Sequence, residues 1–146
     1  MLSVRLATAE DMPYMLEQAE QFVDYIPQHL TFDPMYMQDI LTGMMELGIV
    51  LLAVEDDKPI GGIGGMPVKC VFDSNHTTMA ELFLWIDPNH RKGSAMIRLI
   101  KTFEADAKSF GADTVTLCHT NATPGLGKIY ERYGFSLAES TYSKEV

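Results

Sequence analysis

The sequence has little of what several classes of protein require. It holds 2 cysteines in 146 residues, too few for a disulfide framework, and neither belongs to a C-x-x-C pair that would bind zinc or do redox chemistry. No apolar run approaches the roughly 20 residues of a membrane span. The first residues, MLSVRLATAED, lack the apolar stretch of a signal peptide. These absences predict a soluble, cytoplasmic protein with no membrane partner and no metal site.

Positive charge is also scarce. The chain has 11 Lys and Arg against 20 Asp and Glu, for a net charge of −9. Nucleic-acid binding depends on an excess of basic residues, so the balance argues against such a partner. A local cationic site remains compatible with it, because Arg91 and Lys92 are adjacent. With 47% hydrophobic and 21% charged residues, the composition predicts one globular domain over residues 1–146.

The two cysteines lie in apolar segments. Cys70 is part of VKCVF and Cys118 is part of TVTLCHT. A free cysteine in such surroundings usually behaves as a small hydrophobic residue. We therefore expect both side chains to be buried packing residues.

The first part of the chain predicts one strand followed by two helices. Residues 3–7 begin as a strand, and Thr8 with Asp11 three positions later resembles a capping box. Apolar residues then recur at helical spacing over residues 9–24, and again over the methionine-rich residues 33–48, where proline stands in the first turn and glycine follows the end.

The rest of the chain predicts strands with two further helices. The strands are residues 49–55, 60–72, 79–87, 114–119 and 135–143, and the helices follow HRKGSA up to about residue 110 and cover residues 123–134. The order is β-α-α-β-β-β-α-β-α-β, in the α/β (α+β) class. The glycines of GGIGG are followed by Met66 and Pro67 rather than by a helix, so they indicate a strand and not a dinucleotide-binding loop.

One junction predicts a ligand. In DPNHRKGSAMIRLIKTFE the strand stops at Pro88, and Gly93 and Ala95 leave space before an amphipathic helix. The amides of a first helical turn are unpaired and favour an anion. Basic residues at a helix amino terminus are unfavourable unless an anion offsets them. We expect a phosphate or pyrophosphate here; the alternative is an ordinary solvated helix start.

The segments LFLWIDP, NHRKGSA, MIRLIKTFEADAKSFGA, TVTLCHT and NATPGLGKIYERYGF resemble the acetyl-CoA-binding half of the GCN5-related N-acetyltransferase (GNAT) family. The short form is similar to small members carried by bacteriophages. The resemblance implies the GNAT fold, with a mixed, mostly antiparallel sheet, a V-shaped opening between the two central strands and helices on both faces. It also implies acetyl-CoA as cosubstrate.

The resemblance assigns the cofactor-binding residues. The family's phosphate loop, Q/R-x-x-G-x-G/A, corresponds to HRKGSA, with His90 in the first position or with Arg91 there and the loop one residue short. The pyrophosphate would contact Arg91, Lys92, Gly93, Ser94 and Ala95. The pantetheine arm would contact Leu84 and Ile86 on the preceding strand and Asn121 after the next strand, with Lys128 near it at the start of the last helix.

The catalytic residues follow in the same way. Tyr130 matches the family's tyrosine in Y-x-x-x-G-F, and a phenol of pKa about 10 stays protonated to donate to the leaving thiolate. Without the motif it would be a packed aromatic residue. Glu81 is the first candidate for the general base and His119 the second. By strict alternation Glu81 would point with Phe83 and Trp85, and a surface charge is its alternative.

The function implied is transfer of an acetyl group from acetyl-CoA to a primary amine by direct attack on the thioester. The alternative is a non-catalytic acyl-CoA-binding or regulatory protein. The acceptor, a small molecule or a peptide, would contact the amino-terminal half, in particular Phe22, Tyr25, His29, Phe32, Met35, Tyr36, Met44 and Met45. Asp24, Asp33 and Asp39 could attract a cationic amine or form a solvated face. A homodimer through residues 135–143 is left open.

Overall fold

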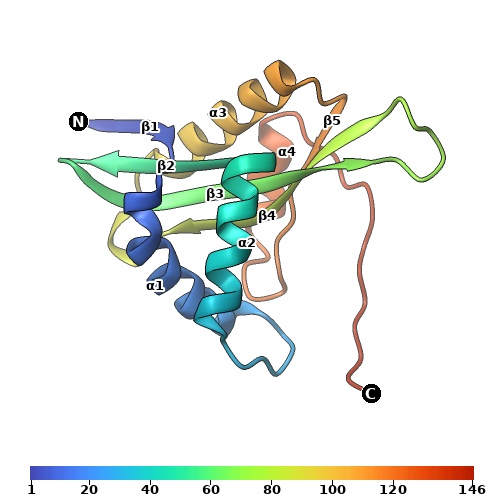
Figure 1. Cartoon of the computed structure of the whole chain (residues 1–146). Coiled ribbons are helices and arrows are strands. Elements are labelled where there is room, and N and C mark those ends of the chain that lie inside the picture. The colour runs from blue at the N-terminus through green and yellow to red at the C-terminus, as the bar shows by residue number, and fades with distance from the viewer.

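The computed structural model describes all residues 1–146 and contains one five-stranded sheet in the order β1-β2-β3-β4-β5 (Figure 1). The strands are β1 (Leu2–Leu6), β2 (Ile49–Glu55), β3 (Lys58–Lys69), β4 (Thr77–Ile86) and β5 (Thr114–Thr116). The first four strands pair antiparallel and β4 pairs parallel to β5. The prediction of a mixed, mostly antiparallel sheet is therefore confirmed.

Helices cover both faces of the sheet. The helices are α1 (Met12–Phe22), α2 (Pro34–Leu47), α3 (Ala95–Phe110) and α4 (Leu126–Arg132). The alternating residues of β2 divide the core: Val50, Leu52 and Val54 pack in one cluster with residues of α1 and α2, whereas Ile49, Leu51 and Ala53 pack in the other with residues of α3 and α4. The continuous apolar run IVLLAV is thus a strand buried on both faces.

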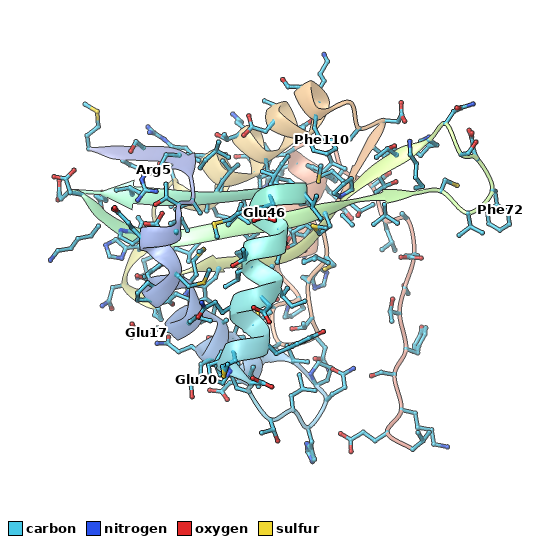
Figure 2. The ribbon with its side chains drawn as sticks, in the orientation of Figure 1. Arg5, Glu17, Glu20, Glu46, Phe72 and Phe110 are labelled. Atoms are coloured by element: carbon cyan, nitrogen blue, oxygen red, sulfur yellow. The ribbon has the colours of Figure 1, made fainter.

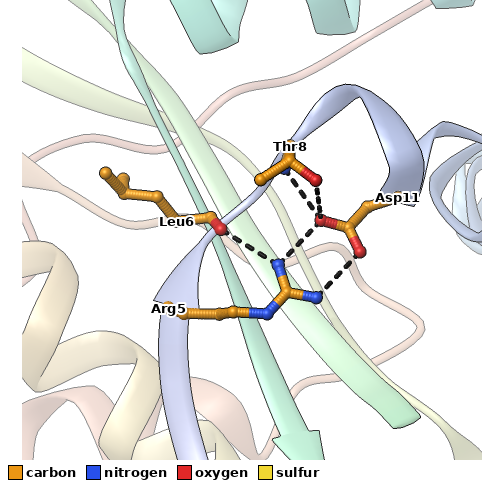
Figure 3. A network of polar contacts seen from close by, with 4 residues as sticks. All are labelled: Arg5, Leu6, Thr8 and Asp11. Atoms are coloured by element: carbon orange, nitrogen blue, oxygen red, sulfur yellow. Dashed lines mark hydrogen bonds and ion pairs between the residues drawn. The ribbon is translucent and has the colours of Figure 1, made fainter. Parts of the chain in front are cut away.

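The start of the first helical segment confirms the expected capping box. A short 3-10 turn, η1 (Ala9–Asp11), leads into α1, and the Asp11 carboxylate accepts hydrogen bonds from the Thr8 amide at 2.8 Å and the Thr8 hydroxyl at 3.2 Å. Both terminal nitrogens of the Arg5 guanidinium also donate to this carboxylate, at 2.8 and 2.9 Å (Figure 3). The network joins β1 to the turn that leads into α1.

The glycine-rich segment is the interior of β3. Gly61, Gly62, Gly64 and Gly65 are all buried and pair with both β2 and β4. A Cβ atom on Gly65 would lie 2.5 Å from the Ala80 carbonyl oxygen and 2.7 Å from the Phe103 ring. The strands can therefore approach one another only because these positions carry no side chain. The strand interpretation of GGIGG is confirmed.

A β-bulge in β4 changes the direction of its side chains. Gly64 pairs with Phe83 and Gly65 pairs with Glu81, so that Leu82 has no partner on β3. One extra residue reverses the inward and outward alternation beyond it. Glu81 consequently lies on the face covered by α3 and α4, opposite to Phe83, and the expectation that it would point with Phe83 and Trp85 is wrong.

The carboxyl-terminal part of the sheet is smaller than predicted. β5 ends at Thr116 rather than at residue 119, and no strand follows α4. Residues 135–146 run as an irregular tail that reaches the segment before α2, where Glu145 accepts a hydrogen bond from the His29 amide at 3.0 Å. In this tail Leu137 is 82% and Tyr142 is 93% exposed. Alternating residues form a strand only when a neighbouring strand pairs with them, and none does here.

Side chains that point away from the body mark the outer surface of the molecule. Figure 2 shows Glu17 and Glu20 on α1 and Glu46 on α2 directed outward, and Phe72 projecting from the tip of the connection between β3 and β4. Phe72 is 96% exposed. No helix of the structure is both long enough and apolar enough to cross a membrane.

Candidate active site

The two strands at the centre of the candidate site separate after a short parallel contact. Pairing between β4 and β5 covers three residue pairs and ends at Ala80 and Thr116. From Glu81 to Ile86, β4 is paired with β3 alone, and the chain after β5 diverges from it. The backbone edge of β4 that faces this opening is free of a strand partner. The predicted V-shaped opening is present.

Glu81 lies at the point where the strands separate. Its side chain is 7% exposed. Burial disfavours the charged form and raises the pKa of the Glu81 carboxyl to about 7, although hydrogen bonds from Cys118 partly oppose the shift. A carboxyl with a pKa near neutrality is protonated and deprotonated in comparable amounts at physiological pH, which suits proton transfer.

Cys118 is a site residue that sequence reasoning missed. Its thiol donates to Glu81 Oε2 at 3.2 Å, and burial together with the nearby Glu81 charge raises the pKa of the thiol to about 12. The expectation that both cysteines are buried is wrong, since Cys118 as a residue is exposed and Cys70 is half-buried. Cys118 lies two residues after Thr116, which pairs with Ala80 on β4. Continuing this parallel pairing by two residues would have placed Cys118 beside the segment that contains Glu81.

Tyr130 on α4 completes the group. Its hydroxyl donates to the Cys118 carbonyl oxygen at 3.0 Å, while its ring belongs to the core cluster and the residue is 6% exposed. Burial, with the charges of Glu81 and Cys118, raises the pKa of the phenol above its usual value, so the hydroxyl stays protonated. His119, the second candidate for the base, is exposed, and its ring centroid lies 6.3 Å from that of Tyr130.

The predicted phosphate loop has the shape of an anion site. α3 begins at Ala95, and no side chain caps its amino terminus at Ser94. The first-turn amides therefore remain available to an external anion. A Cβ atom on Gly93 would meet only the His90 carbonyl oxygen, at 3.6 Å, so the space beside this glycine is open. Lys92 and Ser94 are exposed next to it. These residues fit a pyrophosphate group.

The Arg91 side chain is directed elsewhere. Its Nε donates to the Ile86 carbonyl oxygen at 2.9 Å and its terminal nitrogen donates to the Tyr25 hydroxyl at 3.1 Å. The guanidinium carbon lies 4.8 Å from the centre of the Trp85 ring and 5.5 Å from that of Tyr25, within range of a cation-π contact. In this conformation Arg91 holds the loop against β4 and the 3-10 turn that follows α1, η2 (Val23–Tyr25). His90, one position earlier, lies 3.5 Å from the Glu55 carboxylate.

The remaining predicted cofactor residues lie around the opening. Leu84 and Ile86 pack on the core cluster of the α3 face from the part of β4 that has no β5 partner. Asn121 is exposed in the turn after β5, and Lys128 is exposed on α4. The structure thus brings β4, the turn after β5, the start of α3 and α4 to one edge of the sheet.

A separate cavity of about 380 Å³ lies on the other face, between α1, α2 and β4. Of the residues expected to bind an acceptor, Phe22, Phe32, Tyr36 and Met44 line it, and Tyr25, His29, Met35 and Met45 do not. Its wall includes Leu82, the bulged neighbour of Glu81, together with Phe83 and Trp85. Asp87 joins this wall to α1, because it accepts hydrogen bonds from the Tyr14 hydroxyl at 2.9 Å and the Trp85 indole at 3.3 Å.

Comparison with solved structures shows the same fold in several proteins of low sequence identity. Ribosomal-protein-alanine N-acetyltransferase from Brucella melitensis biovar Abortus 2308 has a TM-score of 0.81 at 14% identity, with 99% of each chain covered. A predicted acetyltransferase with acetyl-CoA from Clostridium acetobutylicum has a TM-score of 0.79 at 14% identity, covering 99% of this chain and 96% of that one. Glucosamine-6-phosphate N-acetyltransferase from Arabidopsis thaliana has a TM-score of 0.77 at 14% identity, covering 99% and 98%.

No curated protein matches the chain by sequence. The sequence profile of the Acetyltransferase (GNAT) family, however, matches residues 14–135, which include the candidate site from Glu81 to Tyr130. This range is most of the chain, and the V-shaped opening and the uncapped start of α3 agree with it. The protein therefore belongs to the GNAT acetyltransferase family.

Proposed function

We propose that the protein, as a single domain over residues 1–146, is an acetyl-CoA-dependent N-acetyltransferase that acts on a primary amine. The observation that carries the proposal is the grouping of Glu81, Cys118 and Tyr130 where β4 and β5 separate. Amine acetylation needs a base and an acid. A buried carboxyl of pKa about 7 can act as the base and a protonated phenol can act as the acid. The family and the acetyl-CoA-bound neighbour support acetyl-CoA as cosubstrate.

The reaction we propose needs no covalent enzyme intermediate. Glu81, directly or through water, takes a proton from the ammonium group of the acceptor, and the free amine nitrogen attacks the thioester carbonyl carbon. The carbon to sulfur bond then breaks, and Tyr130 donates its proton to the departing thiolate. The attacking nitrogen loses its second proton as the amide forms, which restores the Tyr130 phenol, and Glu81 releases the proton it took to solvent. The products are the N-acetylated acceptor and coenzyme A.

We assign binding of the cosubstrate to the edge formed by β4 and α3. Leu84 and Ile86 offer backbone groups to the pantetheine arm, and Asn121 and Lys128 flank it. The pyrophosphate contacts the amides of Gly93, Ser94 and Ala95 and the ammonium group of Lys92, while Arg91 anchors the loop through its contacts with Ile86 and Tyr25. The open space beside Gly93 supports this arrangement.

One observation favours the alternative of a non-catalytic acyl-CoA-binding protein. The ring of Tyr130 is packed in the core, and its hydroxyl is already engaged with the Cys118 carbonyl oxygen. Catalysis requires the hydroxyl to leave that partner for the leaving sulfur. A protein that only binds acyl-CoA would not need this hydroxyl to move, and the acetyl group would remain on the coenzyme.

Titration of acetyl-CoA by calorimetry into wild type and a Gly93→Glu variant tests the proposal, combined with a thiol-release assay over a set of amines. The space beside Gly93 lets the new side chain fold in place, and its charge repels a phosphate, so we expect binding to weaken at least tenfold. Gly43→Glu is the matched control, because a Cβ atom at Gly43 in α2 meets nothing within 4 Å. Absence of acetyl-CoA binding to wild type would contradict the proposal, and binding without thiol release from any amine would favour the alternative.

A further inference from the structure

The cavity between α1, α2 and β4 is almost entirely apolar. Of its 21 lining residues, 17 are hydrophobic. Its volume of about 380 Å³ lies at the lower end of the range for small-molecule sites. The space suits one ring or one alkyl chain, and it is too small for an oligosaccharide or a folded peptide.

The charges near the cavity do not enter it. Asp33 is the one ionisable carboxylate in the wall, and its Oδ1 accepts the hydrogen bond of the Tyr36 amide at 3.0 Å, which caps α2. No Lys, Arg or His lines the cavity. Glu17, Glu20 and Glu46 on the same helices point outward (Figure 2). The wall thus offers no free carboxylates for a polycation and no cation for a phosphate or a carboxylate.

One polar atom in the wall lacks a partner. The side-chain oxygen of Gln18 is buried and makes no hydrogen bond within the chain, and Gln18 lines the cavity. A buried acceptor without a partner costs free energy, which a ligand that donates one hydrogen bond would recover. The wall therefore offers a ligand apolar contacts and, at Gln18, one free hydrogen-bond acceptor.

The cavity also reaches the bulge of β4. Leu82 and Phe83 belong to its wall, and Leu82 is the unpaired residue that directly follows Glu81 in β4. Leu82 is 53% exposed, so the amine of a ligand seated here would lie at the mouth of the cavity. A ligand seated here would present its amine at the bulge of β4, one residue from Glu81 but on the opposite face of the strand, so its proton would reach the Glu81 carboxylate through water.

From these observations we infer that the acceptor is a small primary amine with an apolar aromatic or alkyl body, held in the cavity with its amine at Leu82. This inference rests on the proposed function for the chemical step, and on the cavity for the class of acceptor. It excludes polyamines, amino sugars and sugar phosphates as preferred acceptors, because each needs charged or polar partners that the wall lacks.

The first part of the test compares acceptors. Thiol release from acetyl-CoA is measured with phenethylamine and hexylamine against spermidine and glucosamine. We expect kcat/KM to be at least tenfold higher for the two apolar amines. A preference for spermidine or glucosamine would overturn the inference, while thiol release itself would still support the proposed function.

The second part of the test uses two variants of α2. Ile40 lines the cavity and is 37% exposed, whereas Leu47 is 63% exposed on the same helix and lies outside the cavity. Ile40→Lys places a cation in the wall, so we expect at least a tenfold loss of kcat/KM for phenethylamine with the affinity for acetyl-CoA unchanged. Leu47→Lys should behave as wild type. Equal effects of the two variants would overturn the inference.

A binding measurement keeps the inference testable if the protein transfers no acetyl group. Phenethylamine is titrated by calorimetry into the protein without acetyl-CoA. We expect binding to wild type and to Leu47→Lys that is lost in Ile40→Lys, and weaker binding of spermidine. Failure of phenethylamine to bind wild type would overturn the inference about the cavity, independently of whether acetyl-CoA binds.

Discussion

The Cys118 thiol donates a hydrogen bond to the buried Glu81 carboxylate at 3.2 Å, across the opening where β4 and β5 separate. This contact places the carboxyl beside Tyr130, whose hydroxyl donates to the Cys118 carbonyl oxygen at 3.0 Å. Cys118 therefore connects the two residues to which we assign proton transfer, through its side chain on one side and its main chain on the other.

Replacement of Glu81 by Gln should lower kcat by about 10²–10⁴, because the amide cannot accept the proton of the acceptor. The pKa of Glu81 is about 7 and the base must be deprotonated, so kcat/KM of wild type should rise as the pH increases from 6 to 8. The variant should lose that limb of the pH profile. Glu104→Gln, on the exposed side of α3, is the control. An unchanged profile in Glu81→Gln would remove Glu81 from the mechanism.

The same variant should differ in stability in a pH-dependent way. The folded state raises the pKa of Glu81 from 4.5 to about 7, so folding favours the protonated form, and the stability of wild type falls as the pH rises through this interval. Glu81→Gln removes the buried charge and should be more stable than wild type at pH 8 by about 1–3 kcal/mol, with little difference at pH 4. Urea unfolding at both pH values measures this. A loss of stability at pH 8 would show that the carboxylate is better accommodated than its burial indicates.

Replacement of Tyr130 by Phe should reduce kcat by about 10²–10⁴ and leave the affinity for acetyl-CoA unchanged, since only the hydroxyl is lost. The missing hydrogen bond to Cys118 should cost about 1 kcal/mol of stability. Tyr133→Phe, at the end of the same helix and 38% exposed, is the matched control. Full activity in Tyr130→Phe would assign the tyrosine to packing alone.

Two glycine substitutions should have opposite effects on stability. Gly43 lies inside α2, where an added Cβ atom meets nothing within 4 Å, so Gly43→Ala should stabilise the protein by about 0.5–1 kcal/mol. Gly65→Ala should destabilise it by about 1–3 kcal/mol or more, because the Cβ atom would lie 2.5 Å from the Ala80 carbonyl oxygen. Thermal unfolding of both variants measures the contrast. Equal stabilities would contradict the close approach of β3 and β4 at this glycine.

The pairing of Arg5 with Asp11 should contribute stability that depends on pH. Hydrogen bonds from Arg5 lower the pKa of Asp11 from 3.8 to about 2, so the contribution is complete above pH 4 and is lost as the pH falls toward 2. Asp11→Asn should cost about 1 kcal/mol at pH 7, and the difference from wild type should shrink between pH 4 and 3. Asp56→Asn, whose carboxylate side chain is 87% exposed, should change stability by less than about 0.5 kcal/mol. A constant difference at all pH values would contradict the shifted pKa.

The sequence predicted the local elements well where the pattern was strong. The apolar strand β2, the capping box at Thr8 and Asp11 and the helical spacing of α2 and α3 are confirmed, because each depends on residues close together in the chain. The predicted strand over residues 135–143 failed for the opposite reason. Its alternating pattern needed a partner strand, and whether one is available is not encoded in that segment.

The sequence by itself determined the family motifs, the buried strands and the glycine placed just before α3, since these follow from residue type and spacing. Only the tertiary structure decided how the side chains of the candidate site meet. The unpaired Leu82 turns Glu81 toward Cys118, and Arg91 folds onto Trp85 instead of remaining free. Both outcomes depend on contacts between segments distant in sequence, where the insertion of a single residue into one strand reverses the direction of a side chain.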